Sequence, residues 1–256
     1  MIEGPSPPEP RRRSRRNERP CVCAPVCLLA TALGLAGFAG QAAASSGPSS
    51  TPAIIGGGYA SNAPWAARLF VNGQQNCTAT IIAPQYILTA KHCVASSGTY
   101  TFRIGSLDQS SGGTMATGAA ITRYPGAADL AIVRLSTSVN ATYSPLGTST
   151  DVRAGQTVQV YGWGATSRCG SEINCQSRYL KVANVRVTTP QCSDYEGGVA
   201  VCATYGDGIT AGGDSGGPMF ASGRQVGVAS TSDRQSSTAY TNITRYRSWI
   251  SQVAGV

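Results

Sequence analysis

One serine and one carboxylate stand among four glycines and a proline in the stretch Gly212-Gly213-Asp214-Ser215-Gly216-Gly217-Pro218. Glycine adopts positive φ and lets another molecule approach the main chain closely. The stretch is therefore either a tight turn with a surface serine or an activated Ser215 whose neighbouring backbone N–H groups face a developing oxyanion. The second interpretation requires a general base and an orienting acid elsewhere in the chain.

His92, the only histidine, stands at the end of an apolar run, Leu88-Thr89-Ala90-Lys91-His92-Cys93. The run predicts a buried strand that ends at the histidine. A lone histidine is often structural, but imidazole is the side chain whose ordinary pKa lies near neutral pH, where the proton transfer must occur. We therefore expect His92 to be the general base for Ser215.

Asp129 opens the apolar segment Asp129-Leu130-Ala131-Ile132-Val133. A carboxylate at the start of a strand is either a cap or a buried group, and its burial is costly unless a donor meets it. A buried Asp129 that accepts the N–H of His92 would hold the imidazole in one tautomer and stabilise its protonated form. Histidine, then aspartate, then serine is one of the chain orders known for this catalytic unit.

Short β-type runs separated by turn residues occupy most of the chain. Of 256 residues, 41% are hydrophobic, only 12% are charged and 31 are glycine, which is typical of a β-rich globular protein. Only the tail from Ile243 to Val253 has apolar residues at helical spacing. The short strands of the rest of the chain, separated by turn residues, predict a sandwich or barrels rather than βαβ units. The predicted strands are Ala66–Val71, Thr78–Ile82, Tyr86–Thr89, Tyr100–Ile104, Thr157–Tyr161, Leu180–Val187, Gln225–Ala229 and Ala239–Ile243.

The net charge of +8 lies partly in the first 20 residues, because residues 54–256 hold 14 Lys and Arg against 9 Asp and Glu. The basic residues in that part are scattered singly, so no nucleic-acid partner is expected. Eighteen arginines against two lysines, with abundant Ala and Gly, favour a GC-rich genome such as that of a filamentous actinobacterium.

Residues 1–44 have the three parts of a secretory signal peptide. Six arginines lie within residues 11–19, an apolar run follows from about residue 21 to 38, and the segment ends in Gln41-Ala42-Ala43-Ala44. A transmembrane anchor is the alternative, but the run is short for a span and contains a proline and glycines. We expect cleavage after Ala44, a secreted, extracellular protein and no stable membrane anchor.

An even number of cysteines remains after that cleavage, which in an exported chain indicates disulfides. Their spacing favours sequential pairs, each closing a short loop. Zinc is the alternative, but this part of the sequence has no Cys-x-x-Cys and a single histidine. The expected pairs are Cys77–Cys93, Cys169–Cys175 and Cys192–Cys202.

Five segments, in order from Ile54 towards the C-terminal helix, together resemble the trypsin/chymotrypsin family of serine endopeptidases. The resemblance implies an all-β fold of two perpendicular six-stranded antiparallel β-barrels with a short C-terminal helix and an active site between them. Barrel one would span about residues 54–150 and barrel two about 151–256. The segments are Ile54-Ile55-Gly56-Gly57, Leu88-Thr89-Ala90-Lys91-His92-Cys93, Asp129-Leu130-Ala131, Gly162-Trp163-Gly164 and Gly213-Asp214-Ser215-Gly216-Gly217-Pro218.

The resemblance implies a role for each residue of the catalytic unit. Ser215 would be the nucleophile, His92 the general base and then acid, and Asp129 the orienting carboxylate. The backbone N–H groups of Gly213 and Ser215 would form the oxyanion hole. Ser230 matches a serine that supports the triad and begins a strand pairing with substrate. Two expected disulfides match those of the family, Cys77–Cys93 and Cys192–Cys202.

Ile54 matches the residue whose freed amine pairs with the aspartate before the nucleophile, here Asp214. This buried pair would hold the oxyanion loop in its working shape. Residues 45–53, a spacer rich in Ser and Pro, then form a short activation peptide. Because Ala53 precedes the cut, an arginine-specific protease would not make it.

The substrate pocket departs from the family pattern. Ile209 aligns with the pocket floor, where trypsin-like members have aspartate, and Thr210 follows it. Ser232 and Thr238 align with the walls, where wide pockets have glycines. We expect a shallow apolar pocket that favours small or medium aliphatic residues. Arg or Lys specificity, the alternative, would require Asp207 to reach the pocket.

The sequence therefore predicts a serine endopeptidase that hydrolyses protein or peptide substrates through an acyl-enzyme, with protein protease inhibitors as further partners. We expect a monomer that needs no cofactor. No metal is expected either, since the family's calcium loop needs carboxylates and residues 105–120 contain only one, Asp108. A catalytically silent homologue that serves as a binding module is one competing interpretation, although the three catalytic residues are all present. An esterase is another, although no Gly-x-Ser-x-Gly elbow lies between a strand and a helix.

Overall fold

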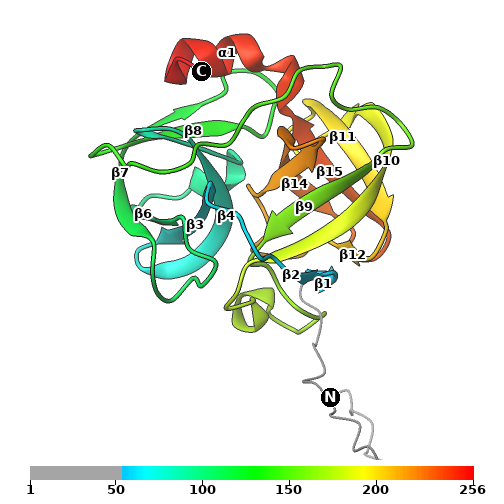
Figure 1. The fold of residues 1–256 in the computed structure, drawn as a ribbon, viewed down its shortest axis with the longest axis horizontal. Coiled ribbons are helices and arrows are strands. Elements are labelled where there is room, and N and C mark those ends of the chain that lie inside the picture. Colours follow the sequence, from blue (N-terminus) through cyan, green and yellow to red (C-terminus); the bar gives the residue numbers. More distant parts are fainter. Residues whose placement is uncertain (1–53) are drawn as a thin grey trace, which may run out of the picture. The chain divides into compact units, whose positions relative to one another are not determined.

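Six antiparallel strands close into a first barrel in the part of the chain that the computed structural model describes, residues 54–256 (Figure 1). The strands are β3 (Ala66–Val71), β4 (Gln74–Ala83), β5 (Tyr86–Thr89), β6 (Tyr100–Ile104), β7 (Thr114–Arg123) and β8 (Ala131–Leu135). Their order is β3-β4-β5-β8-β7-β6, and pairing of β3 with β6 closes the barrel. Alternate side chains of β6 are buried, as a strand with one face in a core requires.

Six further strands form a second barrel from β9 (Thr157–Gly162), β10 (Lys181–Ser193), β11 (Val199–Tyr205), β13 (Pro218–Ala221), β14 (Arg224–Ser232) and β15 (Ser237–Asn242). They follow the order β11-β15-β14-β13-β9-β10. The long strand β10 pairs with β9 on one side and β11 on the other, and so closes the barrel. The expected fold of two six-stranded antiparallel barrels with a short C-terminal helix is confirmed.

The first strands of the described chain pair with the second half of the chain, and the C-terminal helix packs on the first barrel (Figure 1). Strand β1 (Ile55–Gly56) pairs with β12 (Gly208–Ile209), and β2 (Gly58–Tyr59) adds to β10 of the second barrel. At the other end, helix α1 (Arg247–Ala254) buries Ile250 and Ala254 in the core of the first barrel. Of the residues assigned to barrel one by sequence, β2 therefore joins the sheet of barrel two, and β1 forms a separate two-stranded sheet with β12.

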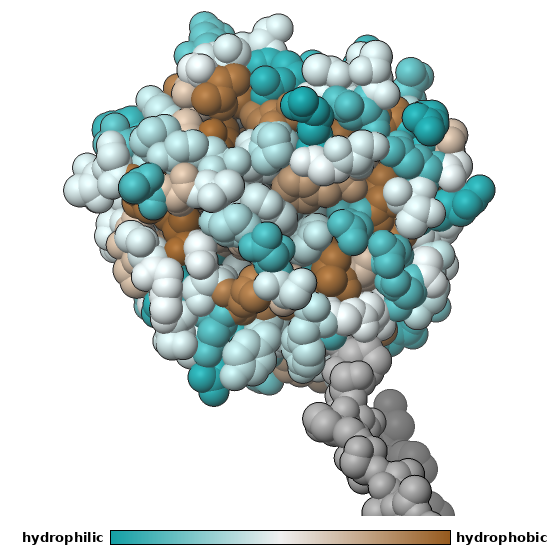
Figure 2. Space-filling model, in the orientation of Figure 1, coloured by the Kyte–Doolittle hydropathy of each residue, from teal (hydrophilic) through white to brown (hydrophobic). Residues whose placement is uncertain are grey.

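Separate hydrophobic cores fill the two barrels. Leu69, Ile87 and Phe102 are fully buried in the first, and Val160 and Met219 in the second. On the face drawn in Figure 2, apolar side chains occur in separate groups between polar ones. Strands β7, β11 and β13 are missing from the sequence prediction. Most side chains of β7 are exposed and its apolar pattern is weak, whereas β13 is fully buried but only four residues long.

The expected signal peptide and activation peptide, residues 1–44 and 45–53, lie outside the described residues. Within residues 54–256, no helix has both the length and the apolarity needed to cross a membrane. The helical tail expected from Ile243 consists of a 3-10 turn, η3 (Ile243–Arg245), followed by α1.

Three disulfides join the sequential cysteine pairs that the spacing favours. Cys77–Cys93 links β4 to η1 (His92–Val94), the turn that carries His92. Cys192–Cys202 joins β10 to β11. Cys169–Cys175 closes the loop that contains η2 (Glu172–Cys175).

Replacing both Cys77 and Cys93 with serine should lower the free energy of unfolding by about 3 kcal/mol, because the unfolded chain regains the entropy of an open loop. Urea unfolding followed by fluorescence measures the change. The double serine variant of Cys169 and Cys175 is the matched control. It opens a loop of 6 rather than 16 residues, so its loss should be smaller, about 2 kcal/mol. A larger loss in the control would contradict the expectation.

Candidate active site

Three polar side chains from the two barrels meet at Asp129. His92 opens η1 three residues after the end of β5, Asp129 lies two residues before β8, and Ser230 lies on β14. His92 Nδ1 is 2.7 Å from Asp129 Oδ2, and the His92 backbone N–H donates to Asp129 Oδ1 at 2.9 Å. The Ser230 hydroxyl donates to Oδ2 at 2.7 Å. The carboxylate therefore holds His92 by both its ring and its backbone, and its bond to Ser230 joins the two barrels.

The surroundings of Asp129 keep its carboxylate ionised although it is fully buried. Burial raises its pKa, but the hydrogen bonds and charge of His92 and the hydrogen bond of Ser230 outweigh this effect, so its pKa lies below the usual range. An ionised Asp129 accepts a hydrogen bond from the Nδ1–H of His92, which leaves Nε2 as the acceptor nitrogen of the neutral ring.

A second buried carboxylate, Asp194, holds the backbone of Asp129 in place. Asp194 Oδ2 accepts the N–H of Asp129 at 3.0 Å and the Thr241 hydroxyl at 2.8 Å. Its other oxygen accepts the N–H groups of Glu196 and Gly198 at 3.0 and 2.8 Å. Sequence reasoning missed Asp194 because it lies in the loop between β10 and β11, outside every recognisable motif.

Ser215 lies on a loop between β12 and β13 that is packed tightly against the first barrel. Gly216 has φ 78°, and a Cβ there would come within 2.2 Å of the Thr89 hydroxyl, so a side chain does not fit. The Ser215 carbonyl accepts the N–H of Thr78 on β4 at 2.8 Å. The first barrel therefore positions a serine that belongs to the second.

Two backbone N–H groups beside the serine have no acceptor within residues 54–256, those of Gly213 and Ser215. The Gly212 carbonyl accepts the N–H of Ala165 at 2.8 Å, so the N–H of the same trans peptide, on Gly213, points the other way. The Gly213 carbonyl accepts the Thr78 hydroxyl at 2.9 Å. Both free N–H groups can therefore stabilise an oxyanion that develops next to Ser215.

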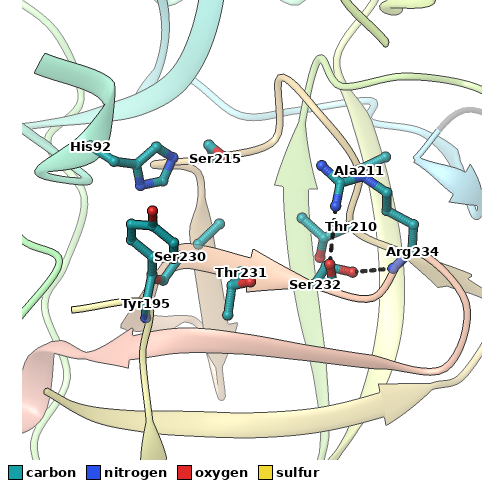
Figure 3. Close-up of a pocket in the computed structure, with 10 residues that line it drawn as sticks. His92, Tyr195, Thr210, Ala211, Ser215, Ser230, Thr231, Ser232 and Arg234 are labelled. Atoms are coloured by element: carbon teal, nitrogen blue, oxygen red, sulfur yellow. Dashed lines mark hydrogen bonds between the residues drawn. The ribbon is translucent and has the colours of Figure 1, made fainter. Parts of the chain in front are cut away.

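His92 and Ser215 line the same cavity of about 350 Å³, and Figure 3 shows them next to each other at one end of it. The imidazole is 30% exposed, so it is open to a substrate. In the described part of the chain, no hydrogen bond links the Ser215 hydroxyl to the ring. Such bonds often form only when substrate is bound.

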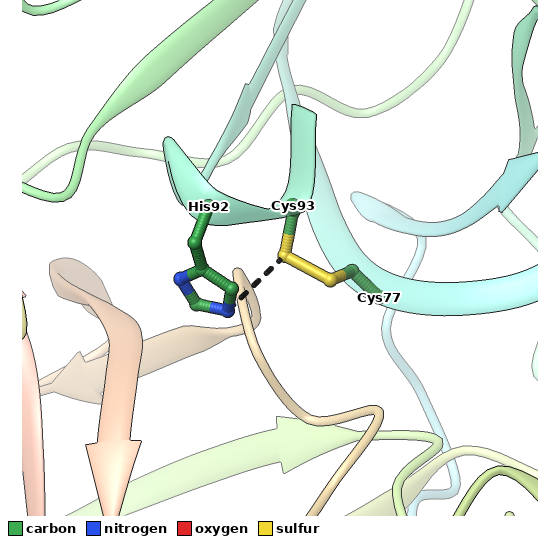
Figure 4. Close-up of side chains that lie close together, drawn as sticks. All are labelled: Cys77, His92 and Cys93. Carbon is green, nitrogen blue, oxygen red and sulfur yellow. Dashed lines mark hydrogen bonds between the residues drawn. A yellow bond between two sulfur atoms is a disulfide. The ribbon is translucent and has the colours of Figure 1, made fainter. Parts of the chain in front are cut away.

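His92 also lies against the first disulfide, with Nε2 3.7 Å from Cys93 Sγ (Figure 4). The donor atoms of Cys77, His92 and Cys93 lie within 4.8 Å of one another, a separation compatible with a metal site. The two sulfurs are bonded to each other at 2.04 Å, so neither is a thiolate that could bind a metal. This cluster therefore supports the imidazole rather than an ion.

Asp214 is 1% exposed and accepts the N–H groups of Gly164 and Ala211 at 2.7 and 2.9 Å. Burial raises the pKa of its carboxyl to about 7, against the lowering effect of these hydrogen bonds and of the Arg68 charge. A cation brought next to Asp214 would stabilise the ionised form.

Arg68 is a fully buried cation on β3 that reaches the Ser215 loop, and sequence reasoning did not single it out. Its Nη1 donates to the Gly213 carbonyl at 3.2 Å, and its Nε donates to Gln109 Oε1 at 2.9 Å. Burial lowers the pKa of Arg68 to about 9, partly opposed by the charge of Asp214. Arg68 thus turns the Gly213 carbonyl towards the first barrel and away from the cavity.

Ile54 is 1% exposed and belongs to the core of the second barrel. Its neighbour Ile55 pairs with Ile209, which lies five residues before Asp214. The residue expected to begin the mature chain therefore lies beside the segment that leads into the Ser215 loop. A free amine exists there only after cleavage before Ile54.

The cavity lining differs from the expected substrate pocket. Thr210 and Ser232 line it, as expected, but Ile209 does not, because it is buried in the pairing of β1 with β12. The Thr238 hydroxyl lies behind the lining and contacts Thr210 Oγ1 at 3.1 Å. The cavity therefore has the hydroxyl of Thr210 where the sequence analysis expected the apolar side chain of Ile209. The full lining is His92, Tyr195, Thr210, Ala211, Ser215, Ala229, Ser230, Thr231, Ser232 and Arg234.

Asp207 does not line the cavity either. Its two oxygens accept the backbone N–H and the side-chain amide of Asn184 at 2.7 and 2.6 Å. Five lining residues were not among the expected site residues, and two of these, Tyr195 and Arg234, bring large polar side chains to the cavity. Both lie in loops, where no periodic pattern or motif in the sequence predicts their position.

The family model described as trypsin matches residues 54–250. The chain belongs to the trypsin family. Trypsin alpha-4 of Lucilia cuprina is 31% identical over 186 residues, 68% of this chain and 71% of that protein. Trypsin alpha of Drosophila melanogaster is 31% identical over 160 residues, 55% of this chain and 59% of that protein. Both are insect proteins, so they give the expected actinobacterial origin no support.

Solved structures agree with this assignment. A mutant of human heparin binding protein has a TM-score of 0.69 and 25% identity, over 78% of this chain and 96% of that chain. Neuropsin, a serine protease expressed in the limbic system of mouse brain, has a TM-score of 0.63 and 26% identity, over 74% and 94%. Family and relatives make the chain a serine endopeptidase of the trypsin/chymotrypsin type.

The free energy of unfolding of the full chain should fall as the pH rises from about 4 to about 7. Unfolded Asp214 loses its proton near pH 4, whereas the folded chain keeps it until about 7. The folded state then binds more protons in this window, and stability falls with pH. The other carboxyls with shifted pKa values change stability only below about pH 4, because their pKa values are lowered on folding. They are Asp108, Asp129, Asp151 and Asp233.

Urea unfolding of the Ser215→Ala chain between these pH values measures the effect without self-digestion. Asp214→Asn in the same background is the control and should remove the fall. A wild-type stability that rises across the window, or an unchanged slope in the control, would contradict the assignment of the effect to Asp214.

Proposed function

We propose that this protein is a secreted serine endopeptidase that cleaves peptide bonds through an acyl-enzyme, with His92, Asp129 and Ser215 as its catalytic residues. The observation that carries the proposal is the hydrogen-bonded chain of His92, Asp129 and Ser230, which ends at the cavity that Ser215 also lines. Protein or peptide substrates follow from the family, and secretion follows from the signal-like residues 1–44.

In the first half-reaction, Ser215 Oγ attacks the carbonyl carbon of the scissile bond while His92 Nε2 takes the hydroxyl proton. The negative charge that develops on the carbonyl oxygen is met by the N–H groups of Gly213 and Ser215. Collapse of this intermediate breaks the C–N bond, and the imidazolium returns its proton to the leaving amine. Water then repeats the sequence on the ester and releases Ser215.

Asp129 acts through the imidazole throughout. Its low pKa keeps the carboxylate ionised, so a negative charge 2.7 Å from His92 Nδ1 stabilises the imidazolium formed in each step. Ser230 keeps Oδ2 in place by its own hydrogen bond. No cofactor or metal is needed for this chemistry, and the enzyme is proposed to act as a monomer that protein inhibitors can block.

Activation is proposed to follow removal of residues 1–44 and then of the spacer 45–53. The new amine of Ile54 would pair with Asp214, whose pKa is raised because burial outweighs its hydrogen bonds and the charge of Arg68. Pairing would bring that pKa down and hold the Gly213–Ser215 backbone in its oxyanion-binding shape.

A reagent that phosphonylates active-site serines should label Ser215 in the mature protein, and mass spectrometry of the modified peptide locates the label. Ser215→Ala should abolish labelling and reduce peptide hydrolysis to the residual rate of roughly 10³–10⁴-fold over water that binding and the oxyanion hole supply. A folded mature chain that is not labelled and cleaves no peptide would instead be a silent homologue with a binding role.

Sequencing of the secreted active enzyme should find Ile54 at its N-terminus. Asp214→Asn should lower kcat even in chain cut before Ile54, because the new ammonium then lacks its carboxylate. Full activity in a chain that begins at Ser45 would contradict the role given to the Ile54 amine.

A further inference from the structure

Arg234 places a positive charge in the wall of the cavity that Ser215 and His92 line. Its Nε donates to Glu172 Oε1 at 2.6 Å, and its Nη1 donates to the Ser232 carbonyl at 3.1 Å. Its backbone N–H donates to the Ser232 hydroxyl at 2.9 Å. These contacts hold the guanidinium in one orientation over the strand that forms the cavity wall.

One nitrogen of that guanidinium, Nη2, has no hydrogen-bond partner among residues 54–256. Figure 3 shows the guanidinium above Ser232 and turned towards the side on which Ser215 lies. The described residues that line the cavity include no aspartate or glutamate, so the carboxylate that pairs with Arg234, that of Glu172, lies outside the lining. A guanidinium with unused donors binds a carboxylate with well-defined geometry.

Hydroxyl groups at the base of the cavity also favour an acceptor. Thr210 Oγ1 lies 3.1 Å from the Tyr240 hydroxyl and accepts from the Thr238 hydroxyl at 3.1 Å. Tyr240 and Thr238 are 0% and 3% exposed. The Thr238 hydroxyl also reaches the Thr231 carbonyl at 3.1 Å, and that carbonyl can only accept, so these shared hydroxyl groups give the base of the cavity a polar rather than an apolar surface.

Tyr240 is the member of this cluster that can titrate, and it stays protonated. Burial raises the pKa of Tyr240 far above its ordinary value, with the hydrogen bond of Thr210 as a smaller opposing effect. The phenol therefore keeps its proton throughout the working pH range, and the Tyr240 and Thr210 hydroxyl groups can each donate to the other. Arg234 at the wall therefore supplies the charged donor, and Thr210 at the base adds a neutral hydroxyl group.

We propose that this cavity binds the carboxylate side chain of the residue that precedes the cleaved bond, so that the substrates are peptides with Glu or Asp at that position. The proposal rests on the proposed endopeptidase function and names its substrate class. It replaces the aliphatic preference, for which Ile209 supplies no lining, and the Arg or Lys preference, for which Asp207 is held by Asn184.

Glu172 limits how strong this preference is. Its side chain is 20% exposed and already pairs with Arg234, and its Oε2 accepts the N–H of Gly212 at 2.8 Å. A substrate carboxylate therefore shares the cation with Glu172 rather than having it alone. Arg234 is itself 47% exposed, so water and salt screen the interaction.

The test compares peptides that are identical except for Glu, Gln, Leu or Arg before the scissile bond, each assayed with mature enzyme whose active sites have been counted with the serine reagent. Glu and Gln have nearly the same shape, so their ratio isolates the charge. The kcat/KM for Glu should exceed that for Gln about tenfold, as expected for hydrogen bonds to a charged group. Added salt should reduce this ratio.

Arg234→Gln should bring the ratio of Glu to Gln close to one. Arg224→Gln removes the same charge from an exposed position on β14 outside the cavity lining, and should leave the ratio as in the wild type. Thr210→Val, which deletes the hydroxyl and keeps the shape, should reduce the ratio partly.

A wild-type ratio near one, a preference for Arg or Leu, or an unchanged ratio in Arg234→Gln would overturn the substrate assignment while leaving the endopeptidase function intact. If Arg234→Gln does not fold, the wild-type ratio and its salt dependence still decide. Absence of labelled sites together with absence of cleavage of every peptide would instead overturn the endopeptidase function itself.

Discussion

A carboxylate buried between two barrels must be surrounded by donors, and Asp129 obtains them from both sides. His92 supplies two from the first barrel and Ser230 supplies one from the second. An unpaired charge at this depth would cost several kcal/mol, roughly, so the pairing also fixes how the barrels sit against each other. The orientation of the imidazole is therefore a property of the interface between barrels rather than of either barrel alone.

The Ser215 loop obeys the same constraint with different partners. Its carbonyl groups turn towards the first barrel, where Thr78 and Arg68 donate to them, and this leaves the opposite N–H groups free at the cavity. Asp214 is buried behind the loop with two backbone N–H groups and no adjacent ion-pair partner. A loop whose polar groups are satisfied on one side is rigid enough to present unsatisfied donors on the other.

Local pattern identified most strands with one apolar face, but it missed β7 and also β11 and β13, although β13 is fully buried. Strand β7 is mostly exposed, and so it lacks the alternation that marks β6. The substrate cavity was harder still. Alignment with the family, counted back from Ser215, placed Ile209 at the floor of the cavity. Instead, Ile209 is buried where β1 pairs with β12, and Thr210 lines the cavity.

The sequence by itself determined the family, the β-rich class and the three residues expected to carry the chemistry, because these depend on short motifs whose residue types have few other uses. Only the tertiary structure decided what surrounds them. Asp194, Arg68 and Arg234 act through partners that are 62 to 145 positions away in the chain. Such contacts form when barrels close and loops meet, and no local pattern in the sequence encodes them.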